Sequence, residues 1–133
     1  TGGGSNLSGL MFPFLGQQLR GGQKIDIIGC EPLSCPSFTK GKYAYDHGDM
    51  ARMTPLIKMH TLGSDFLPPA NHSGGLRYHG MSYHLSHLYD LGLMRAKERN
   101  QLYWRVIGRQ ASGRQAISGI RKFTIVPVNS ETL

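Results

Sequence analysis

The sequence predicts an α/β fold with β-α-β units around a parallel sheet, and three observations carry that prediction. A glycine-rich turn at residues 2–4 precedes an apolar stretch over Asn6 to Leu19, which is typical of a loop that opens a helix. A short apolar stretch then predicts a buried strand. Its apolar residues are Ile25, Ile27, Ile28 and Cys30. Loop, helix and strand in this order form the later part of a β-α-β unit.

The elements follow one another along the chain. In the helix predicted over residues 6–19, apolar side chains recur on one face, while Gly9 and Pro13 weaken or kink it. Residues 34–75 are rich in proline and polar side chains, which predicts mostly loop, and long ordered loops often carry binding sites. A second helix is predicted over residues 80–92, with Ser82 as its N-cap and Gly92 just after its end.

Charge divides the chain near Met94. Residues 1–94 hold seven lysines and arginines against six acidic residues, whereas residues 95–133 hold eight against two. The first segment therefore carries a charge of +1 and the second +6. We predict two units: residues 1–94, and a divergent basic tail over residues 95–133.

Composition argues against a membrane protein. No apolar run approaches the roughly 18 residues that a membrane-spanning helix needs, and the first residues lack the pattern of a secretory signal. The expected location is the cytoplasm, with no membrane partner.

The glycine-rich turn has the chemistry of a phosphate site. Consecutive glycines let backbone N–H groups converge on an anion, and the start of the following helix adds partial positive charge. Ser5 and Asn6 contribute a hydroxyl and an amide. Neither the spacing of a dinucleotide-binding loop nor a Gly-Lys-Ser/Thr sequence is present, so nucleoside phosphates are not the first choice of ligand. A purely structural glycine turn is the alternative.

A second polar stretch lies at residues 62–81. Asp65, His72, Arg77 and His79 alternate there with glycines and a double proline, a composition suited to a shaped polar loop rather than to a core. The histidines do not have the spacing of a zinc site.

These residues resemble a known family. The segment from Thr1 to about Leu93 is similar to the later part of a tryptophan synthase beta chain of the second, divergent type. The motifs that carry this resemblance are TGGGSN, EPLSCPSFTKG and HSGGLRYHG. The resemblance implies part of a fold-type II pyridoxal-phosphate enzyme, incomplete in its N-terminal half. Such an enzyme joins indole to the aminoacrylate made from L-serine.

The resemblance also implies roles for individual residues. Gly2, Gly3, Gly4, Ser5 and Asn6 match the loop that holds the cofactor phosphate. Asp65 resembles the aspartate of the loop that closes around the substrate, and Arg77 and His79 belong to the divergent type's own pattern. The carbonyls of Gly2 and Phe66 match those around a monovalent cation, K⁺ or Na⁺. An alpha subunit and a homodimer are the implied partners.

The family's Schiff-base lysine belongs to the half that precedes Thr1 in the match, and no lysine here corresponds to it. We therefore expect no catalytic residue in this chain and an incomplete reaction without that half. In the tail, Phe123 stands where the family has a glutamate. A shifted reading frame, a mis-assembled reading or a recombined end is favoured as the origin of the tail over an evolved nucleic-acid-binding segment.

Two alternatives stay open: a non-catalytic protein that binds pyridoxal phosphate or phosphate, and a module that binds nucleic acid through the basic tail. Basic segments rich in arginine and glycine also occur in RNA-binding proteins, although we expect no nucleic-acid partner here.

Overall fold

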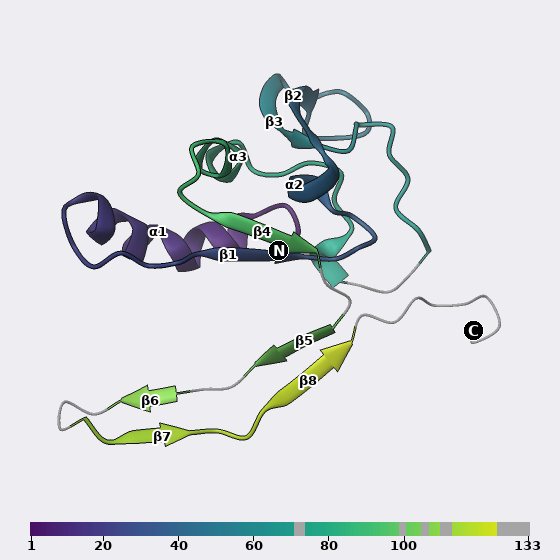
Figure 1. The fold of residues 1–133 in the computed structure, drawn as a ribbon. Coiled ribbons are helices and arrows are strands. Elements are labelled where there is room, and N and C mark those ends of the chain that lie inside the picture. Colours follow the sequence, from purple (N-terminus) through teal and green to yellow (C-terminus); the bar gives the residue numbers. More distant parts are fainter. Residues whose placement is uncertain (71–73, 99–100, 105–106, 110–112, 125–133) are drawn as a thin grey trace.

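The computed structural model describes residues 1–70, 74–98, 101–104, 107–109 and 113–124. It is an α/β fold with a small parallel sheet and separate antiparallel pairs, as Figure 1 shows. The helices are α1 (Ser5–Leu19), α2 (Ser37–Lys40) and α3 (Tyr83–Asp90), with a short 3-10 helix η1 (Gly74–Leu76). The strands are β1 (Ile28–Glu31), β2 (Lys42–His47), β3 (Leu56–Thr61), β4 (Arg95–Glu98), β5 (Gln101–Trp104), β6 (Ile107–Arg109), β7 (Gln115–Ile117) and β8 (Arg121–Thr124).

The parallel sheet pairs β1 with β4, from Ile28 opposite Arg95 to Glu31 opposite Glu98. This confirms the predicted parallel sheet, although the pairing of these two strands was not predicted. The strand is shorter than the apolar run suggested, and its buried residues are Gly29 and Glu31 rather than Ile28 and Cys30. The physical reason at Gly29 is close packing, because an added Cβ would lie 3.2 Å from both Leu7 and Met94.

Both predicted helices are present. The helix α1 runs through Pro13 without interruption. In α3 the Ser82 hydroxyl accepts a hydrogen bond from the Leu85 N–H, which confirms the predicted cap. Gly92 follows the helix with φ +70°, a left-handed conformation that glycine adopts without strain.

The prediction of mostly loop over residues 34–75 agrees with the structure outside the regular elements, but it missed the elements that the stretch contains. That stretch holds α2 and the antiparallel hairpin β2–β3, in register from Lys42 opposite Thr61 to His47 opposite Leu56. Asp49 organises the connecting loop, since its carboxylate accepts from the N–H groups of Met53 (3.1 Å) and Thr54 (3.0 Å). These hydrogen bonds lower the pKa of Asp49 to about 2.

Within the predicted basic tail, β5 pairs antiparallel with β8, and β6 pairs antiparallel with β7. The first four residues of that tail form β4 and therefore share a sheet with β1. The division of the chain at residue 94 stays a prediction, and Phe123 lies in β8.

The core joins the three helices to the start of β4. Its fully buried side chains are Met11, Leu15, Phe38, Met81, Leu85 and Met94. Beside it lies a buried carboxylate. Glu31, at the end of β1, accepts hydrogen bonds from the N–H groups of Phe38 (2.9 Å) and Thr39 (2.8 Å) and from the Thr39 hydroxyl (2.7 Å). One side chain thus satisfies the second and third N–H donors of α2, while the first, from Ser37, donates to the Cys35 carbonyl (3.0 Å).

We expect Glu31→Gln to destabilise the fold by about 1–3 kcal/mol, because the amide cannot accept all three hydrogen bonds and a buried donor loses its partner. Urea denaturation followed by circular dichroism measures the change. Asp26→Asn, which removes an exposed ion pair with Arg95, is the control and should have a much smaller effect. Equal losses for the two variants would contradict the capping role.

His60 generates a second prediction. Its ring lies among Tyr43 (centroids 4.8 Å apart, stacked), Tyr89 (5.0 Å) and Phe38 (5.9 Å). Burial lowers the pKa of His60, and the charges of Asp90 and Glu31 oppose that effect only in part. Below the ordinary histidine pKa of about 6.5, the unfolded chain therefore binds a proton that the folded chain binds less readily.

The free energy of unfolding should accordingly fall as the pH drops from 7 towards 5, and His60→Phe should flatten this dependence. Urea midpoints measured across that range test it, with the exposed His84 replaced by Phe as the matched control. An unchanged slope in His60→Phe would refute the assignment.

Candidate functional site

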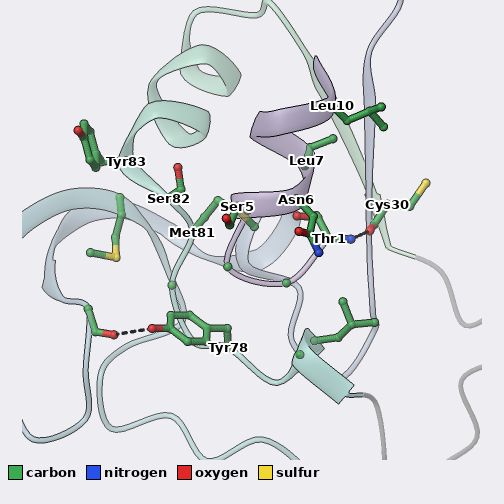
Figure 2. A pocket seen from close by; sticks show the side chains of 18 of the residues that line it. Thr1, Ser5, Asn6, Leu7, Leu10, Cys30, Tyr78, Met81, Ser82 and Tyr83 are labelled. Atoms are coloured by element: carbon green, nitrogen blue, oxygen red, sulfur yellow. Dashed lines mark hydrogen bonds between the residues drawn. The ribbon is translucent and has the colours of Figure 1, made fainter. Parts of the chain in front are cut away.

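The glycine-rich turn opens into a cavity of about 940 Å³, within the range of small-molecule sites. Its walls come from the turn, the start of α1, the β2–β3 hairpin and residues 75–83, as Figure 2 shows from close by. The lining residues are Thr1, Gly2, Gly3, Gly4, Ser5, Asn6, Leu7, Leu10, Cys30, Gly48, Ile57, Met59, Gly75, Leu76, Tyr78, Gly80, Met81, Ser82 and Tyr83. All five residues predicted to form the phosphate loop are among them.

Close packing requires glycine in this turn. A Cβ on Gly2 would lie 2.2 Å from the carbonyl oxygen of Gly75. Gly4 has φ +103°, and a Cβ there would lie 2.7 Å from Leu85 Cδ1 and 2.9 Å from Met81 Sδ. The Gly3 carbonyl accepts a hydrogen bond from the Ser82 N–H (2.8 Å). The turn is therefore pressed backbone to backbone against residues 75–85.

The start of α1 is suited to an anion. Gly4 is the N-cap, and no side chain caps the helix. The first intrahelical bonds run to the Gly4 carbonyl from the N–H (2.8 Å) and the hydroxyl (2.9 Å) of Ser8. The N–H groups of residues 5–7 precede those bonds, so they can donate to a ligand while the helix dipole favours negative charge.

The walls carry no formal side-chain charge. Among the described residues that line the cavity there is no lysine, arginine, histidine, aspartate or glutamate. Among these residues, the positive potential available to a ligand comes from backbone N–H groups. Ser5, Ser82 and Tyr83 bring further hydroxyl groups to the lining, whereas the Tyr78 hydroxyl donates to the Gly48 carbonyl (3.2 Å; Figure 2). The arrangement can bind and orient a flat ligand that bears a phosphate, and no lining side chain is a strong acid or base.

The residues predicted for the substrate loop lie outside this cavity lining. Asp65 forms an exposed ion pair with Arg52 (2.6 Å), and Arg77 donates to the Pro68 carbonyl (3.2 Å). His79 is buried, and its Nε2 donates to the His47 carbonyl (2.8 Å). Their roles towards a substrate remain predictions.

Gly2 lines the cavity and Phe66 does not, so the cation site also remains a prediction. His72 lies outside the described residues. Within the described residues, no three histidine, cysteine or acidic side chains gather as a metal site would require. The same residues include no helix that is both long and apolar enough to span a bilayer.

Sequence reasoning missed the wall opposite the glycine turn. Gly75, Tyr78 and Met81 belong to the polar stretch that the sequence singled out, but their packing against Gly2, Gly3 and Gly4 spans most of the chain. The available signal was the run of glycines at 74, 75 and 80, which permits such close approach.

No protein-family model matches the chain. Several curated proteins are similar to it in sequence. The chain is 54% identical over 95 residues to a tryptophan synthase beta chain from Pseudothermotoga lettingae, a match that covers 71% of the chain and 22% of the relative. It is 53% identical over 100 residues to that of Thermosipho africanus, covering 75% and 24%. A tryptophan synthase beta chain 2 from Methanothermobacter thermautotrophicus is 53% identical over 97 residues, covering 73% and 23%. The chain thus spans about a quarter of the length of these relatives.

The crowding at Gly4 generates a prediction. Gly4→Ala should destabilise the fold, because the added Cβ both strains the backbone at φ +103° and meets Leu85 and Met81. Gly9→Ala is a matched control in the same helix, with open space around the new Cβ, and should be neutral or stabilising by up to about 1 kcal/mol. Thermal unfolding of both variants tests the expectation, which fails if Gly4→Ala melts like the unaltered chain.

Proposed function

We propose that this chain forms the phosphate-binding part of a pyridoxal-phosphate enzyme. The premise is that about three quarters of the chain is homologous to a segment of tryptophan synthase beta chains. The observation that carries the proposal is the uncapped start of α1 behind Gly2, Gly3 and Gly4. Ser5 and Asn6 complete the loop. The cavity beside it is large enough for a phosphorylated pyridine.

The local fit supports this ligand class. Side chains on Gly2 or Gly4 would collide with residues 75–85, so only glycine lets the turn lie this close to that wall. The helix start offers N–H donors and partial positive charge, which together favour a dianion. Apolar walls at Ile57, Met59 and Met81 suit the face of an aromatic ring and exclude water from it.

Pyridoxal phosphate, when bound, supplies an electron sink, and the protein supplies placement and the groups around it. In this chain the residues that line the cavity bind the phosphate and orient the ring. We propose that the lysine that attaches the cofactor comes from the part of a longer enzyme that corresponds to the relatives' remaining length, because no lysine lines the cavity among the described residues.

The finer parts of the proposal follow the family. The reaction is the β-replacement of the L-serine hydroxyl by indole, on a fold-type II scaffold. Asp65, Arg77 and His79 act from the loop beside the cavity, and the carbonyls of Gly2 and Phe66 contribute to a monovalent-cation site. An alpha subunit and a second beta chain are the proposed partners. The non-catalytic and nucleic-acid alternatives are not favoured, since the relatives are named as an enzyme.

Binding of pyridoxine 5′-phosphate tests the proposal. This probe has the ring and phosphate of the cofactor but no aldehyde, so it cannot form adventitious Schiff bases with surface lysines. We expect calorimetry to show at least about tenfold tighter binding than for pyridoxine, and inorganic phosphate to compete. Equal affinity for the two probes, or no binding of either, would rule out a phosphate site in this loop.

A further inference from the structure

Residues 77–82 form a short segment that hydrogen-bonds to the glycine turn on one side and to the end of the β2–β3 hairpin on the other. The Ser82 N–H donates to the Gly3 carbonyl (2.8 Å) on one side. On the other side the Met81 N–H donates to the His60 carbonyl (2.9 Å), and the His79 carbonyl accepts from the Leu62 N–H (2.7 Å). The segment therefore lies between the proposed phosphate loop and β3.

Tyr78 projects from this segment onto the glycine turn. The three atoms nearest to a Cβ built on Gly3 all belong to the Tyr78 ring, at 3.5, 3.7 and 3.8 Å. The ring lines the cavity, and 48% of the residue is exposed. The ring thus stands on the side of Gly3 where a side chain would project, and it lines the cavity (Figure 2).

The ring itself is held at several points. Its hydroxyl donates to the Gly48 carbonyl at the end of β2 (3.2 Å), and the ring of His79 stacks on it at an interplanar angle of 9°. His79 is anchored in turn to the His47 carbonyl. The Tyr78 carbonyl accepts from the Ser37 hydroxyl (3.4 Å). Tyr78 therefore has a defined place in the folded chain.

We infer that Tyr78 is a positioning residue for the phosphate loop: its ring holds Gly3 in the conformation in which the N–H groups at the start of α1 converge on the ligand. Three successive glycines lose much conformational freedom when they order, and a rigid wall that orders them beforehand reduces the loss on binding. The inference rests on the proposed function and adds a residue that acts through the loop.

The test compares three variants with the unaltered chain, using pyridoxine 5′-phosphate and pyridoxine as probes. Tyr78→Leu should weaken binding of the phosphorylated probe by at least about fivefold and leave the affinity for pyridoxine nearly unchanged. Tyr78→Phe, which keeps the ring, should restore most of the loss. Tyr45→Leu removes an exposed tyrosine of β2 that does not line the cavity and is the matched control.

The ratio of the two affinities separates positioning from general destabilisation, which thermal unfolding of each variant monitors. If the unaltered chain binds the phosphorylated probe selectively and Tyr78→Leu keeps that selectivity, the inference about Tyr78 is overturned while the proposed function stands. Failure of Tyr78→Phe to restore selectivity would also overturn it, because the hydroxyl rather than the ring would then be the active feature. No selectivity in the unaltered chain overturns the proposed function and this inference together.

Discussion

The backbone-to-backbone contact between the glycine turn and residues 75–85 is the constraint on which the site depends. It places Gly2 against the Gly75 carbonyl and Gly4 against the side chains of Met81 and Leu85. Leu85 and Met81 are also core residues, so the same contact joins the start of α1 to the packing of α3. Because these positions are glycine, the turn can lie against this wall, and both the turn and the wall line the cavity.

The buried carboxylate of Glu31 and the cavity obtain their polar partners in different ways. Glu31 is buried, yet three hydrogen bonds to α2 compensate its carboxylate. The cavity, by contrast, presents backbone dipoles rather than charged side chains among the described residues. Backbone donors cannot be titrated, so binding of a phosphate at this loop depends on its geometry and on the ionisation of the ligand.

Local signals predicted part of this structure. The N-cap at Ser82 and the glycine after α3 each depend on neighbouring residues, and the structure has them where the sequence placed them. The apolar face of α1 is buried only at Met11 and Leu15, whereas Leu10 and Phe14 are exposed. The β2–β3 hairpin escaped prediction because Lys42, Asp46 and His47 interrupt the apolar alternation of its strands. The burial of Glu31 could not be predicted either, because a carboxylate in a strand indicates an exposed position unless its hydrogen-bond partners are known.

The candidate site divides in the same way. The glycine turn was recognisable from six consecutive residues, whereas the opposite wall at Tyr78 comes from a distant part of the chain and depends on tertiary packing. Asp65, Arg77 and His79 were selected by type and resemblance. Their observed partners are Arg52 and the carbonyls of Pro68 and His47, which only the fold could supply.

The parallel pairing of β1 with β4 has a consequence for the order of folding. Residues 28–31 meet residues 95–98 only after the intervening chain, which includes the hairpin and α3, has been brought into a closed loop. Contacts so distant in sequence raise the contact order, and their chain entropy is lost before their pairing energy is gained. The hairpin and α3 are local, so they can form first. We therefore expect the pairing of β1 with β4 to form late in folding.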